Sequence, residues 1–167
     1  IFGEVNPAAR TTTTWARKMA DLPVVNTTPT NGELRYSEGP FIGYRAWRKA
    51  EKSPLLPFGH GLSYTTFISE LVSADKSKAS VNVTNTGSRS GAEVLQIYAV
   101  HESLDNFERR LVGFTKVQLN SGESRTVDIA LEPLGFKQFK GVWQDLPGKW
   151  QITLAQSAFD SGSTLIV

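Results

Sequence analysis

Side chains capable of acid–base or nucleophilic chemistry are sparse in this sequence. It has no cysteine and only two histidines among 167 residues, which excludes thiolate nucleophiles and cysteine-based zinc sites. His60 stands between two glycines, without a serine, aspartate or second histidine at a diagnostic spacing, so a loop histidine that bonds backbone carbonyls is the favoured interpretation. His101 follows an apolar run, and we expect it to be exposed.

Carboxylates are present, but nothing in their sequence context indicates an active site. Catalytic carboxylates work as a pair whose surroundings push the two pKa values apart, and Glu33, Glu38 and Glu51 show no such pairing. We therefore predict no catalytic residue in this chain. Two histidines without cysteine or a dense carboxylate loop also predict no metal site, and we expect no cofactor.

Aromatic rings could instead bind sugars, because the apolar face of a sugar ring suits an aromatic plane. Trp150 alternates with Ile152 and Leu154, so we expect it in a core. Trp47 and Trp143 lie in loop-like stretches. There, packing between domains is the favoured interpretation and sugar stacking is the alternative.

Composition and charge narrow the class of protein. The hydrophobic content of 40% is enough for a sizeable core, and the net charge is only +2. The nearest approach to a basic patch, residues 45–52, is better interpreted as a solvated face than as a phosphate-binding surface. No apolar run is long enough to span a bilayer. We expect neither nucleic acid nor a membrane as a partner, and favour a secreted or periplasmic location over a cytoplasmic one.

One stretch, residues 55–67 (LLPFGHGLSYTTF), divides the chain into two parts of different character. It holds Pro57, Gly59 and Gly61 within five positions, which excludes a helix and makes a ladder strand unfavourable. Its remaining residues are largely apolar or aromatic, unlike those of a flexible linker. We predict a stiff connector that packs against its neighbours.

The part that follows the connector has the pattern of a β-sandwich. Short runs of alternating apolar and polar residues, with no helical period between them, predict about seven strands. Gly113 is a candidate bulge and residues 120–122 are a hairpin signal. The predicted fold class is mainly β, an immunoglobulin-like sandwich over residues 68–167. The strands are expected at 79–84, 93–100, 111–119, 126–131, 136–139, 150–154 and 163–167.

The part that precedes the connector cannot close a core of its own. Residues 11–14 predict one short strand, residues 16–22 two helical turns, and residues 24–35 a loop. Residues 36–47 are rich in aromatics and glycine, and we expect them to be extended. One strand, a short helix and aromatic loops do not make two packed layers, so this part is interpreted as the tail end of a larger unit.

Several motifs resemble those of family 3 glycoside hydrolases, in the same order along the chain. IFGEVNPAAR resembles a segment near the end of that family's α/β sandwich domain, and YSEGPFIGYRAW resembles a later stretch. LPFGHGLSYTTF is similar to a family signature almost letter for letter. VTNTG, GAEVLQIY, RLVGF and GESR resemble its fibronectin type III-like domain. By pattern the chain is most similar to β-glucosidases, and exo-acting xylosidases share these elements.

The resemblance implies a division of the chain and a role for it. Residues 1–22 would end the α/β sandwich domain, residues 23–67 would be an extended aromatic loop and connector, and residues 68–167 would be the fibronectin type III-like sandwich. The family's nucleophile lies in a Ser-Asp-Trp-like motif of an N-terminal barrel, which is absent here, and its acid/base glutamate lies upstream. The chain alone is therefore predicted to be inactive. It would brace upstream catalytic domains, and only the intact enzyme would bind a β-glucoside or oligosaccharide.

Three residues are implied as candidates for the rim of the active site in that intact enzyme: Tyr36, Glu38 and Trp47. A second function stays open, a free-standing accessory module that binds carbohydrate or stabilises a partner. The apolar segment 1–15 distinguishes the two, since a free-standing module would not need it. In a larger enzyme, we expect upstream chain to cover this segment.

Overall fold

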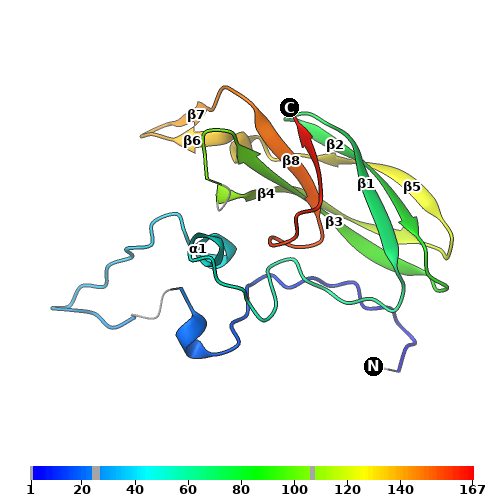
Figure 1. Cartoon of the computed structure of the whole chain (residues 1–167), viewed down its shortest axis with the longest axis horizontal. Coiled ribbons are helices and arrows are strands. Elements are labelled where there is room, and N and C mark those ends of the chain that lie inside the picture. The colour runs from blue at the N-terminus through cyan, green and yellow to red at the C-terminus, as the bar shows by residue number, and fades with distance from the viewer. Residues whose placement is uncertain (1, 24–26, 106–107) are drawn as a thin grey trace.

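Two antiparallel sheets pack face to face in this computed structural model, which describes residues 2–23, 27–105 and 108–167 (Figure 1). One sheet has the order β1-β2-β5 and the other β4-β3-β8-β9. The mainly β fold and the sandwich are thereby confirmed. The strands are β1 (Phe67–Ala74), β2 (Lys78–Asn85), β3 (Gly91–His101), β4 (Arg110–Leu119), β5 (Ser124–Ala130), β8 (Trp150–Ala155) and β9 (Ser163–Ile166).

The main core follows from the alternation along these strands. In β2, Ala79, Val81 and Val83 are fully buried, while the residues between them face outward. Trp150 on β8 is fully buried in the same cluster, as its alternation with Ile152 predicted. Every member of this cluster comes from residues 67–167, so the sandwich closes its core without the preceding part of the chain.

Most predicted strands are confirmed, and the differences lie at the ends of the sandwich. Strand β1 was not predicted, and the short run at 136–139 divides into a 3-10 turn, Pro133–Phe136, and β6 (Lys137–Phe139). Strand β6 pairs with β7 (Trp143–Asp145), also not predicted, in a separate two-stranded sheet. The connection at 120–122 joins β4 to β5, which belong to different sheets, so it is a turn between layers and not a ladder hairpin.

The predicted irregularity at Gly113 is confirmed. Ile97 pairs with Gly113, and the next residue, Tyr98, pairs with Leu111. Val112 is therefore the extra residue of a bulge. Because a bulge strengthens the local twist, it turns the start of β4 where this strand meets the preceding loop.

Residues 2–23 and 27–66 lie on one side of the sandwich, and within these described segments no sheet is formed (Figure 1). The strand predicted at 11–14 is wrong, since only a single bridge joins Trp15 to Leu56. The helix predicted at 16–22 is limited to a 3-10 turn, Met19–Asp21. Residues 24–26 of the predicted loop lie outside the described residues. No helix of the described chain is long and apolar enough to cross a membrane.

The expectation of extended chain over 36–47 is wrong for its second half. Gly43–Lys49 form the helix α1. Tyr44 and Trp47 stand three positions apart, so they lie on one face of this helix. Two of the aromatic residues that suggested an extended segment therefore form the apolar face of a short helix, and Trp47 is only 3% exposed.

Candidate functional site

The connector and α1 meet the outer face of the four-stranded sheet in a second cluster of buried side chains. Tyr98 on β3 is fully buried at its centre. The ring of Tyr44, from α1, stacks on Phe58 of the connector with centroids 5.0 Å apart and meets Tyr98 edge-on at 6.3 Å. Three segments distant in sequence thus contribute aromatic rings to one junction.

Hydrogen bonds fix the connector on this face. Gln96, 3% exposed, donates from Nε2 to the Gly59 carbonyl (3.0 Å) and to the Gln156 carbonyl (2.9 Å). The Tyr98 hydroxyl donates to Gln96 Oε1 (2.9 Å), which holds the amide in this orientation. The Ala158 amide donates to the Phe58 carbonyl (3.0 Å). The stiff connector that the sequence predicted is therefore bonded on both edges.

Two arginines complete the junction. Arg109 is 5% exposed, its guanidinium lies 4.5 Å from the Tyr98 ring centroid, and Nη1 donates to the Asp160 carbonyl (2.5 Å). Arg48 of α1 donates to the Ala158 carbonyl (2.8 Å). Burial, and secondarily the charge of Arg48, lowers the pKa of Arg109, while burial raises the pKa of Tyr98. Tyr98 therefore stays protonated at neutral pH and keeps its hydroxyl as a donor.

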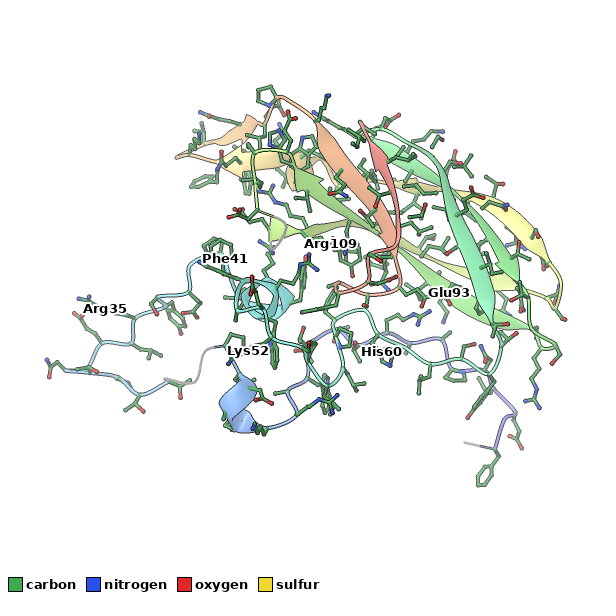
Figure 2. The ribbon with its side chains drawn as sticks, viewed as in Figure 1. Arg35, Phe41, Lys52, His60, Glu93 and Arg109 are labelled. Carbon is green, nitrogen blue, oxygen red and sulfur yellow. The ribbon has the colours of Figure 1, made fainter. Side chains whose placement is uncertain are left out.

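An ion pair joins the beginning of the chain to the sandwich. Arg10 Nη2 contacts Glu93 Oε1 of β3, and their side chains are 15% and 9% exposed. Burial raises the pKa of Glu93, and the charge of Arg10 acts in the opposite direction. Nearer the start of the chain, Asn6 Oδ1 accepts a hydrogen bond from the Tyr64 amide (2.7 Å). Figure 2 places Glu93 on the side of the sandwich that faces these residues.

Residues 6–15 and 55–64 run antiparallel beside each other. The Thr11 amide donates to the His60 carbonyl (2.8 Å), and the Gly59 amide donates to the Thr11 carbonyl (2.8 Å). Trp15 exchanges backbone hydrogen bonds with Leu55 and Leu56. We call these two segments the antiparallel ribbon. His60 contributes to it through its backbone carbonyl.

The three predicted rim residues are not on one surface. Tyr36 is 78% exposed on the segment 27–42, which extends away from the sandwich past Arg35 (Figure 2). Glu38 is half-buried in a turn where its carbonyl accepts from the Phe41 amide (3.1 Å). Trp47 is buried at the base of this segment, in α1.

The expectation that His101 is exposed is wrong. It is 3% exposed, with Nδ1 2.7 Å from Ser103 Oγ and Nε2 3.1 Å from the Pro147 carbonyl. A carbonyl only accepts, so Nε2 carries the hydrogen and Nδ1 accepts from the serine. His101 continues the inward alternation of Ile97 and Ala99, and this signal in the sequence could have identified it.

Sequence reasoning also missed Gln96, Tyr98 and Arg109, the residues that hold the connector. Within the described parts of the chain, no group of three His, Asp or Glu side chains could hold a metal ion. The junction consists of rings, amides and guanidiniums bonded to carbonyls. This chemistry positions chain segments relative to each other.

Comparison with known proteins identifies similar sequences and structures. A family model for the fibronectin type III-like domain matches residues 93–158. The chain is 37% identical over 165 residues to a probable β-glucosidase I of Aspergillus clavatus, covering 90% of this chain and 19% of that protein. It is 36% identical over 174 residues to thermostable β-glucosidase B of Acetivibrio thermocellus, covering 96% of this chain and 23% of the other.

Among solved structures, the chain is similar to a β-glucosidase from Kluyveromyces marxianus in complex with glucose. The TM-score is 0.90 at 33% identity, over 99% of this chain and 22% of that one. β-glucosidase 3B of Thermotoga neapolitana gives 0.89 at 29% identity, over 99% and 25%. The chain spans about a fifth of the length of the curated relatives it matches.

Proposed function

We propose that this chain is the structural, non-catalytic C-terminal part of a family 3 glycoside hydrolase of the β-glucosidase type. The match of residues 93–158 to a fibronectin type III-like domain and the similarity of the chain to β-glucosidases over about a fifth of their length support this proposal. In the intact enzyme, upstream domains would hydrolyse terminal β-D-glycosidic bonds with retention of configuration. They would supply the nucleophile and the acid/base carboxylate, which must stand about 5 Å apart.

One observation carries this proposal: residues 2–23 and 27–66 expose apolar side chains that no described residue of this chain covers. Isolated exposed apolar residues are normal, whereas apolar surface gathered in one region is typical of an interface. For their length, these segments expose more large apolar side chains than the sandwich does. Each costs about 25 cal/mol per Å² of apolar surface left in water. The exposed set is Phe2, Val5, Trp15, Met19, Leu34, Tyr36, Ile42, Leu55, Leu62 and Tyr64.

The partner that fits this surface is the upstream catalytic part of the same enzyme. A free-standing module would leave these side chains in water. The sandwich would then act through the junction, because Tyr98, Gln96 and Arg109 hold the connector and α1 in one position. Residues 2–66 would transmit that position to the catalytic domains.

The rim residues are part of this proposal. Tyr36 and Glu38 lie on the segment that extends from the body, so they are the ones that can reach a neighbouring active site. Trp47 would act indirectly by anchoring the base of that segment in α1.

The proposal is tested with the 167-residue chain and the upstream region of a similar β-glucosidase, expressed separately and together. We expect no turnover of an aryl β-glucoside by the chain alone, stable association of the two parts, and turnover by the pair. Turnover by the chain alone would overturn the structural role. So would an upstream region that binds no chain and is fully active and equally stable without it.

A further inference from the structure

The hairpin β6–β7 stands outside both sheets of the sandwich and projects from one end of it (Figure 1). Its two strands pair with each other alone, through residues 137–139 and 143–145. Neither the core of the sandwich nor the junction with the connector includes its aromatic residues. The proposed bracing role leaves this element without a function.

The base of the hairpin is rigidly attached. Phe136, immediately before β6, meets the buried Trp150 edge-on with centroids 5.1 Å apart. Arg110 Nη1 donates to the carbonyls of Gly135 (3.0 Å) and Lys137 (2.7 Å). The hairpin is therefore held in a defined direction, which a binding element needs so that little conformational freedom is lost on binding.

One face of the hairpin is aromatic and polar. Phe139 and Trp143 are directly paired across the strands, 61% and 54% exposed, with ring centroids 5.5 Å apart and planes at 63°. The next pair on the same face is Lys137 and Asp145, joined by an ion pair at 3.4 Å. Exposed rings beside charged hydrogen-bonding groups suit a ligand that has both C–H faces and hydroxyls.

We propose that this face binds a soluble β-glucan or oligosaccharide chain. A sugar ring would stack on Trp143, and Phe139 would contact one edge of that sugar. The hydroxyls of the sugar would form hydrogen bonds with Lys137 and Asp145. The two exposed rings offer only on the order of 250 Å², far below the roughly 800 Å² per partner that a stable protein interface buries. Rings at 63° form a corner, not the coplanar row that a flat crystalline surface would require.

The test is electrophoresis of the 167-residue chain in native gels with and without soluble mixed-linkage β-glucan, and a pull-down with crystalline cellulose. We expect the glucan to retard the wild-type chain, and Trp143→Ala to remove at least four fifths of that retardation. Phe139→Ala should weaken it two- to fivefold. Phe114→Ala, which removes another exposed aromatic ring from the sandwich, should leave it unchanged. Circular dichroism checks that each variant is folded.

Three results would overturn the inference: no retardation of the wild type, equal retardation of Trp143→Ala, or equal loss in Phe114→Ala. Binding to crystalline cellulose but not to soluble glucan would overturn the choice of ligand. Only the choice of a β-glucan as probe rests on the proposed function. If the chain associates with no catalytic region but is retarded by the glucan through Trp143, the proposed function fails and this inference stands. If the chain associates with a catalytic region but is not retarded, this inference is refuted.

Discussion

The buried ion pair between Arg10 and Glu93 attaches the beginning of the chain to the sandwich, and its loss should change the free energy of unfolding. Breaking such a pair from one side leaves an uncompensated buried charge, whereas replacing both members can be nearly neutral. The two members are therefore not equivalent. Loss of the cation leaves a buried carboxylate, while loss of the carboxylate leaves a long arginine that can turn toward water.

We predict that Arg10→Met lowers the free energy of unfolding by about 3 kcal/mol at pH 7.5, and that Glu93→Gln in the same chain restores most of it. Burial raises the pKa of Glu93, and without Arg10 this pKa rises further. An acid whose folded pKa is raised stabilises the fold below its unfolded pKa and loses that contribution as pH rises. The deficit should therefore shrink toward pH 5, as measured by urea denaturation at both pH values. An equal deficit at the two would contradict this account.

At the scale of elements, the connector depends on Gly59. Its φ is +86°, and a Cβ there would lie 2.2 Å from Gln96 Oε1. Gly32 has a similar φ of +79°, with nothing within 4 Å of a Cβ. An alanine at this position would therefore be strained by its backbone conformation alone.

We predict that Gly59→Ala costs about 3 kcal/mol and Gly32→Ala about 1 kcal/mol or less. The difference arises because Gln96 must give up its bond to the connector carbonyl to make room for the methyl group. Thermal unfolding of both variants measures it. Equal shifts in Tm would mean that the close approach to Gln96 does not matter.

The strands of the sandwich could be predicted from sequence because one face of each is buried in a core made by the same segment of chain. The alternation of Ala79, Val81 and Val83 with polar residues indicates which face of the strand is buried. Strand β1 escaped because Ile68 and Val72 are exposed while Ser69 is half-buried, so its apolar residues do not mark the buried face.

The junction could not be predicted in the same way. Tyr98 lies on a strand that is apolar on both faces, which indicates a central strand but not what covers its outer face. That cover comes from Tyr44 and Phe58, far away in sequence. The helix α1 was missed for a related reason: with only seven residues, it is stabilised by this packing and not by its own propensity.

For the molecule as a whole, the two clusters of buried side chains predict whether the sandwich can fold without the residues that precede it. The main core uses only residues 67–167, and the second cluster uses both parts. We predict that a fragment of residues 67–167 unfolds cooperatively, but with a free energy lower by about 3 kcal/mol because Tyr98 loses its cover. Denaturation by urea measures this. Tyr98→Ser should cost less in the fragment than in the chain, and a fragment that shows no cooperative unfolding would refute the separation.

The antiparallel ribbon has a consequence for the order of events during translation. Thr11 Oγ1 bonds the Pro57 carbonyl 46 residues later, and Arg10 bonds Glu93 83 residues later. At about 5–20 residues per second, residues 6–15 wait several seconds on the ribosome for their partners. Residues 6–15 can therefore be fixed in place only after the connector, β1, β2 and the start of β3 have been synthesised. Protease protection of residues 6–15 should accordingly be absent in ribosome-bound chains stalled at residue 50 and present after release.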